Sequence, residues 1–129
     1  MKNPLLFAKR VFLLAGIYGL VVIIPLYFSE HPQGIDYPPD ITHPEWYYGF
    51  AGAVTAWAVM FLFLSRDPLR YRPLMIPSML EKLLFPPAVL VLYLQGRLPD
   101  SFLPLALIDF SFAVAFFIAY KRTKNVEPS

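Results

Sequence analysis

Long runs of apolar residues, separated by short polar segments, dominate the pattern of this chain. Four such runs cover residues 8–28, 46–64, 74–94 and 102–120. A helix of roughly 20 apolar residues is needed to cross a hydrocarbon layer about 30 Å thick. The pattern therefore predicts an all-α fold, a four-helix transmembrane bundle that occupies residues 1–129 as a single domain.

The third run is the least regular of the four. Glu81 interrupts it, and Pro86 and Pro87 follow about one turn later. Proline removes a backbone donor and kinks or breaks a helix, so we expect a kink at this pair. Ser78 and Glu81 have the spacing of a capping box. The start of the third helix is therefore left open between Leu74 and Ser78.

Lysine and arginine are distributed unevenly among the segments that join these runs. Of the 11 in the chain, nine lie at the N-terminus, in the loop 65–73 or at the C-terminus, namely Lys2, Lys9, Arg10, Arg66, Arg70, Arg72, Lys121, Arg122 and Lys124. Arg97 lies between the third and fourth runs, and Lys82 lies inside the third. The loop 29–45 has neither residue type. Because positive residues favour the cytoplasmic side, we predict cytoplasmic termini, a cytoplasmic loop 65–73 and an external loop 29–45.

The composition agrees with a membrane protein and narrows the chemistry. Hydrophobic residues make up 57% of the chain and charged residues 16%, against about 25% charged in average soluble domains. The lack of cysteine excludes disulfides, thiolate catalysis and Cys-ligated zinc. The first apolar run is longer than the roughly 7–15 residues of a signal-peptide core, so we expect it to be retained as a span.

Three charged residues inside the apolar runs are candidates for intramembrane chemistry. Asp109 lies about 12 Å inside the fourth helix, counted by helix rise, where an unpaired carboxylate costs at least about 2.5 kcal/mol. Either Asp109 pairs with Lys82, or it faces a wet cavity as a ligand or proton site, or Lys82 extends alone toward the interface. Glu81 is expected to point elsewhere, as a cap, as a salt-bridge partner of the 65–73 arginines, or as a carboxylate at the floor of the bundle.

The loop 65–73 is the candidate contact surface. It carries Arg66, Arg70, Tyr71 and Arg72, the last three between Pro68 and Pro73, which indicates an ordered turn. Such a basic loop is an ordinary membrane anchor, helped by anionic lipid at about 1 kcal/mol per charge, or a site for a lipid headgroup or partner protein. Three arginines beside a membrane are a poor nucleic-acid surface, so we expect no nucleic-acid partner.

The remaining polar residues give no metal or cofactor pattern. His31 and His43 both precede proline in the loop 29–45, and acidic residues lie nearby. Their spacing matches no metal-ligand pattern. We therefore predict no metal ion, no cofactor and no catalytic residue.

Small residues four positions apart allow helices to approach closely in a membrane. They occur in the first, second and fourth runs as Ala15 with Gly19, Gly49 with Ala53, Gly52 with Ala56, and Ser111 with Ala115 and Ala119. We expect these residues to be helix-packing surfaces.

Two strings carry a resemblance to known proteins. HPEWYYGFAGAVTAW (residues 43–57) and RDPLRYRPLMIPSMLEK (residues 66–82) resemble segments of uncharacterised small four-helix bacterial inner-membrane proteins. In layout the chain is similar to the DoxX-like group, which implies four spans, cytoplasmic ends and a charged turn after the second helix. The sterol isomerase and sigma-2-receptor type is similar in placing acidic residues around an apolar cavity, as Glu81 and Asp109 would do here.

The sequence favours a non-enzymatic role. We expect a small multi-pass protein of a prokaryotic plasma (inner) membrane, an accessory subunit that binds a partner membrane complex, a second copy of itself, or lipid. The alternative is a bundle that binds a small apolar ligand, or handles protons, through Asp109 and Glu81. An isomerase-like enzyme is less favoured, because general acid–base catalysis needs both groups near one substrate, whereas helix rise places Glu81 and Asp109 in opposite halves of the bilayer.

Overall fold

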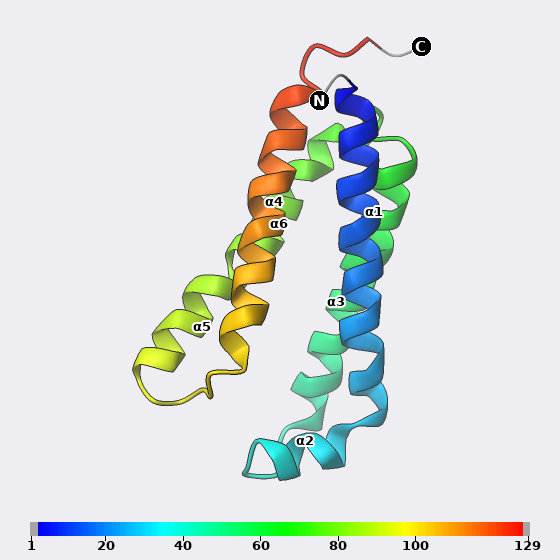
Figure 1. Ribbon diagram of the computed structural model, residues 1–129. Helices are drawn as coiled ribbons and strands as arrows, with labels where there is room; N and C mark the ends of the chain where they lie inside the picture. Colours follow the sequence, from blue (N-terminus) through cyan, green and yellow to red (C-terminus); the bar gives the residue numbers. More distant parts are fainter. Residues whose placement is uncertain (1–2, 128–129) are drawn as a thin grey trace. The chain divides into compact units, whose positions relative to one another are not determined.

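The computed structural model describes residues 3–127, and these form helices and connecting turns without a β-strand. The predicted all-α class is thereby confirmed. The elements are α1 (Pro4–Ile23), the 3-10 helix η1 (Ile24–Phe28), α2 (Glu30–Asp36), α3 (Pro44–Arg66), the 3-10 helix η2 (Arg72–Leu74), α4 (Met75–Leu83), α5 (Phe85–Leu94) and α6 (Phe102–Arg122) (Figure 1). Lys2, counted among the positive charges, lies outside the described residues.

Four helical segments are long and apolar enough to cross a membrane. They are Pro4–Phe28, Pro44–Arg66, Arg72–Leu94 and Phe102–Arg122, with 21 to 25 residues each. Many of their large apolar side chains are exposed, among them Leu14 at 60%, Val21 at 67% and Leu84 at 69%. Such surfaces suit contact with lipid rather than with water. The chain is therefore compatible with a small integral membrane protein.

The chain divides into two compact units. One unit is Leu13–Phe63, and the other comprises the described residues up to Phe12 and from Leu64 onward. The first contains most of α1, together with α2 and nearly all of α3; the second contains α4, α5 and α6 with the start of α1.

In the unit Leu13–Phe63, α1 and α3 approach closely through small residues. A Cβ atom added at Gly19 would lie 2.9 Å from the Ala58 Cβ, and one at Gly16 would lie 2.9 Å from the Ala58 carbonyl oxygen. This confirms the first-helix seam at Gly19. On the second helix the pair Gly49 and Ala53 is wrong as a packing surface, because Gly49 has nothing within 4 Å of an added Cβ and Ala53 is exposed. A Cβ at Gly52 would lie 3.6 Å from the Tyr27 hydroxyl oxygen, but Ala56 is exposed. The small residue of α3 that is buried against α1 is Ala58.

The segment predicted as the external loop 29–45 contains the short helix α2, which the apolar pattern missed. Tyr side chains of α3 hold this region in place. The Tyr47 hydroxyl donates to the Leu26 carbonyl oxygen at 2.6 Å, and the Tyr48 hydroxyl donates to Glu30 Oε1 at 3.0 Å. Polar contacts rather than apolar burial therefore order this end of the unit.

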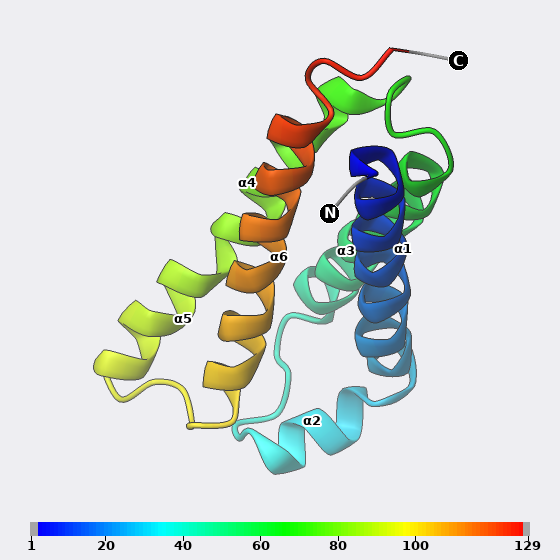
Figure 2. The same ribbon diagram turned by 45° about the horizontal axis from the view of Figure 1, so that its top comes forward.

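In the other unit, α4 and α5 both pack against α6. Helix α4 ends at Leu83 and α5 begins at Phe85, so the kink expected at Pro86 and Pro87 is confirmed as a break (Figure 2). Helix α4 begins at Met75, so a start at Ser78 is wrong. The Ser78 hydroxyl donates back to the Leu74 carbonyl oxygen at 2.6 Å, which a residue inside a helix can do and a cap does not.

Three basic segments meet at one end of this unit. The Arg122 guanidinium lies 5.5 Å from the centre of the Phe7 ring, and Arg72 Nε donates to Thr123 Oγ1 at 3.0 Å. The Phe12 and Phe116 rings stack with their centres 4.3 Å apart, so the start of α1 runs beside α6. These are the segments predicted to share the cytoplasmic side; the side itself stays a prediction.

Candidate functional site

The charged residues inside the spans form one cluster on α4 and α6. Lys82 Nζ lies 3.5 Å from Asp109 Oδ1 and 3.6 Å from Glu81 Oε2. Of the alternatives open for Asp109, pairing with Lys82 is the one that the structure contains. The ammonium group therefore bridges two carboxylates that belong to different helices.

The side chains of this cluster are largely buried. The Lys82 side chain is 5% exposed, and those of Glu81 and Asp109 are each 16% exposed. The Phe112 ring centre lies 5.6 Å from Lys82 Nζ, a distance that permits a cation–π contact. Glu81 Oε2 is buried and has no hydrogen-bond partner. The cluster is thus covered by protein, and one of its oxygen atoms is incompletely satisfied.

The placement of Glu81 corrects the sequence interpretation. Adjacent residues on a helix diverge by about 100°. This geometry predicts that Glu81 points away from Lys82 and Asp109, toward a cap or the 65–73 arginines. Helix rise also placed Glu81 and Asp109 in opposite halves of the bilayer. Backbone position alone does not predict the contact, because the long Lys82 side chain places its ammonium group near both the adjacent Glu81 and Asp109 on α6.

The cluster can do two things chemically. Burying an ion pair gains little net energy, but removing one partner leaves an uncompensated charge that strongly destabilises the fold. The cluster therefore ties α4 to α6. Two carboxylates around one ammonium also leave one negative charge in excess, which a proton or another cation would neutralise.

The second candidate site is the turn that follows α3. The Arg70 backbone N–H donates to Asp67 Oδ1 at 3.3 Å, and the Tyr71 N–H donates to the Asp67 carbonyl oxygen at 3.2 Å. Asp67 therefore orders the turn through both its side chain and its backbone. Arg66 and Arg70 are exposed, and the Arg70 guanidinium lies 5.6 Å from the centre of the Tyr71 ring.

Arg72 has a different role from its neighbours. We expected it among the lipid or partner contacts, yet its guanidinium lies 3.9 Å from the centre of the Tyr120 ring. It also donates to Thr123 Oγ1 and to the Tyr120 carbonyl oxygen. A cation at this position satisfies carbonyl groups left free at a helix C-terminus. Arg72 thus fastens the turn to the end of α6.

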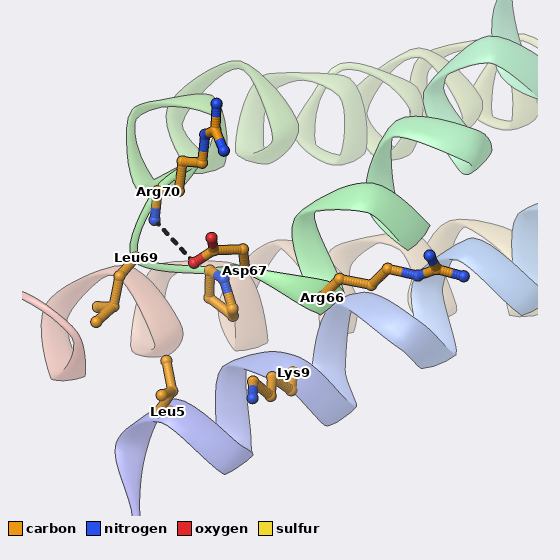
Figure 3. A pocket seen from close by; sticks show the side chains of 7 residues that line it. Leu5, Lys9, Arg66, Asp67, Leu69 and Arg70 are labelled. Carbon is orange, nitrogen blue, oxygen red and sulfur yellow. Dashed lines mark hydrogen bonds between the residues drawn. The ribbon is translucent and has the colours of Figure 1, made fainter. Parts of the chain in front are cut away.

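A hollow of about 440 Å³ lies beside the turn. It is lined by Leu5, Lys9, Arg66, Asp67, Pro68, Leu69 and Arg70. Figure 3 shows Leu5 and Lys9 on α1, Arg66 at the end of α3, and Asp67, Leu69 and Arg70 on the turn, with the Arg70 guanidinium pointing away from α1. Leu5 and Lys9 were missed as site residues. Lys9 was counted as a positive-side charge, but no short-range pattern connects it to residues almost 60 positions away.

The polar residues of the segment 29–45 form no metal centre. Within residues 3–127, no group of three or more His, Asp or Glu residues is placed to hold a metal ion. The His43 imidazole Nδ1 lies 3.3 Å from Glu45 Oε1, and both side chains are largely exposed.

Comparison with known proteins finds no family model that matches the chain, no significant match among curated proteins and no similar solved structure. The resemblance to the DoxX-like group stays a prediction.

Proposed function

We propose that this chain is a non-enzymatic accessory protein of a prokaryotic inner membrane, which crosses the bilayer four times with both termini in the cytoplasm. In this proposal the turn 65–73 binds a component of the membrane, either a partner complex or lipid. The four apolar helical segments support the membrane location. The meeting of the basic segments at one end of a unit supports a common side for both termini.

The observation that carries the proposal is the ordered presentation of the turn. Asp67 braces the backbone of Arg70, and Arg72 fixes the far end of the turn to α6. Arg66 and Arg70 remain exposed between these two anchors. A turn held at both ends loses little conformational entropy when it binds. Such an arrangement suits a binding surface of fixed shape better than an ordinary basic membrane anchor.

A photo-crosslinking residue at position 69 tests this proposal. In native membranes we expect one discrete adduct, a membrane protein or a lipid, whose yield falls when Arg66 and Arg70 are both changed to Gln. The matched control places the same residue at Leu94, which is 74% exposed and lies at the end of α5. Equal, diffuse labelling from both positions would contradict a binding role for the turn.

The orientation can be tested separately, because the chain has no cysteine. Single cysteines at Asn125 and Gln33 should differ when intact cells are treated with an impermeant thiol reagent. We expect labelling at position 33 and none at position 125 until the cells are opened. Labelling of both positions in intact cells would overturn the proposed topology.

A second candidate function is supported by the cluster of Glu81, Lys82 and Asp109. Its two carboxylates exceed its single ammonium by one charge, and Glu81 Oε2 has no hydrogen-bond partner. This arrangement is suited to holding a proton inside the span. Infrared difference spectra of the reconstituted protein would then contain a protonated carboxyl band that is absent from Glu81→Gln and Asp109→Asn. A wild-type spectrum without that band would exclude this function.

A further inference from the structure

The hollow beside the turn combines charge and apolar surface in a way that indicates its ligand. Three of its lining residues are cations, Lys9, Arg66 and Arg70, and one is an anion, Asp67. The hollow therefore has an excess of two positive charges. Within residues 3–127, neither Lys9 nor Arg66 forms a salt bridge, so both charges are available to an anion.

The anionic residue of the hollow is already engaged. Asp67 Oδ1 accepts the hydrogen bond from the Arg70 backbone N–H at 3.3 Å, which fixes the direction of the carboxylate. Arg72 and Arg122 are engaged as well, over the rings of Tyr120 and Phe7. Among the arginines at this end of the unit, Arg66 is thus one that remains open to a ligand.

The position of the hollow along the helices gives its depth in a bilayer. Its residues belong to the first turns of the span Pro4–Phe28 and to the end of the span Pro44–Arg66 or just beyond it. Helix ends of this kind lie where hydrocarbon gives way to headgroups. Leu5 and Leu69 provide apolar wall at the same level. Cations beside leucines at this depth match the boundary between a lipid phosphate and its acyl chains.

We propose that this hollow binds the headgroup of an anionic phospholipid. The exposed Lys9 and Arg66 side chains, whose charged ends point apart in Figure 3, turn toward the phosphate and hold its oxygens through charge-assisted hydrogen bonds, and Leu5 and Leu69 contact the first acyl carbons. Arg70 contributes mainly long-range attraction, because its guanidinium points away from α1 (Figure 3). The inference rests on the proposed function, since it names the ligand of the turn.

Retention of lipid by the full-length protein tests the inference. The protein is reconstituted in nanodiscs that contain phosphatidylglycerol and phosphatidylcholine, released into detergent and weighed by native mass spectrometry. We expect one retained phosphatidylglycerol per chain. At about 1 kcal/mol per charge, Lys9→Gln and Arg66→Gln should each lower its retention about fivefold. Arg70→Gln should have a smaller effect.

Matched variants separate this site from general attraction. Lys124→Gln removes a cation that does not line the hollow; it makes no hydrogen bond to the phosphate there and its charge is screened by salt, so retention should change less than twofold. Asp67→Asn keeps an oxygen to accept from the Arg70 N–H while removing the negative charge, so retention should rise. Arg66→Lys keeps the charge and should retain lipid, which guards against a loss caused by misfolding.

Several outcomes would overturn the inference. Equal loss of lipid in Lys124→Gln and Arg66→Gln would mean diffuse attraction rather than a site. Displacement of the lipid by inorganic phosphate at low millimolar concentration would mean a free-anion site. Equal retention of phosphatidylcholine would remove the selectivity for anionic lipid. If lipid retention fails while position 69 still crosslinks to a membrane protein, the proposed function stands and only this inference falls.

Discussion

The helices inside one unit of the chain are joined by contacts of a different kind from those inside the other unit. In Leu13–Phe63 the helices approach through glycine and alanine, with Gly16 and Gly19 against Ala58. In the other unit, α4 and α6 are joined by the buried ion cluster around Lys82 and by the clamp of Arg72 on the end of α6. Lipid is as apolar as leucine, so helices in a membrane associate through close packing or polar contacts. Close packing of small residues therefore joins the long helices of Leu13–Phe63, and buried charge joins α4 to α6.

Removal of a buried charge should lower the unfolding free energy most in the unit that contains α4 and α6. Changing Lys82 to Met leaves Glu81 and Asp109 facing each other without a cation, and should cost about 3–5 kcal/mol of unfolding free energy. Unfolding in mixed micelles measures this loss. The triple variant Glu81→Gln, Lys82→Met, Asp109→Asn should recover most of the stability, because no charge then remains buried. A Lys82→Met protein as stable as wild type would show that the cluster does not tie α4 to α6.

The clamp at the end of α6 should have the next largest effect. Changing Arg72 to Ala removes a charge-assisted hydrogen bond to Thr123 and the stack on Tyr120, at a cost of about 1.5–3 kcal/mol. Hydrogen exchange should accelerate in residues 119–126 and leave residues 13–63 unchanged. Arg70→Ala is the matched control, since the Arg70 guanidinium lies beside the Tyr71 ring within the turn. Uniform acceleration throughout the chain would contradict a local clamp.

The glycine contacts give a paired test in the other unit. At Gly16 an added Cβ would lie 2.5 Å from a Leu62 methyl group and 2.9 Å from the Ala58 carbonyl oxygen. Gly16→Ala should therefore cost about 1–3 kcal/mol, as overpacking does. Gly49→Ala meets nothing within 4 Å and should stabilise α3 by up to about 1 kcal/mol. Chemical unfolding should therefore give a lower unfolding free energy for Gly16→Ala and a higher one for Gly49→Ala. Changes of the same sign in both variants would contradict the assignment of the close contact to Gly16.

The smallest effect should come from the tyrosine that fastens the turn η1 to α3. Tyr47→Phe removes the hydroxyl that donates to the Leu26 carbonyl oxygen at 2.6 Å. We expect a loss of about 1 kcal/mol, measurable as a lowered midpoint of thermal unfolding. Tyr71→Phe, which keeps the ring beside the Arg70 guanidinium, serves as the reference and should change the midpoint less. A larger shift in the reference would contradict the assignment.

Helix positions could be predicted from the sequence because they depend on local hydropathy. The four apolar runs match the observed segments to within about one turn, and the proline pair marked the break after α4. Pairing of Lys82 with Asp109 could also be proposed from the sequence, since a charge inside a span needs a partner of opposite charge. The role of Arg72 could not, because its partners lie about 50 positions away on α6. Glu81 was misplaced for a related reason, since side-chain length outweighed helical phase.

The interruption at Leu84 has a consequence for how the polypeptide enters a bilayer. Helices α4 and α5 contain nine and 10 residues, so each is roughly 15 Å long, about half of a hydrocarbon layer. Neither helix is long enough to cross the hydrocarbon layer without the other, so both must insert together as one span. A chain in which one piece failed to insert would deliver α6 in the reverse direction and place its basic tail on the opposite side of the bilayer.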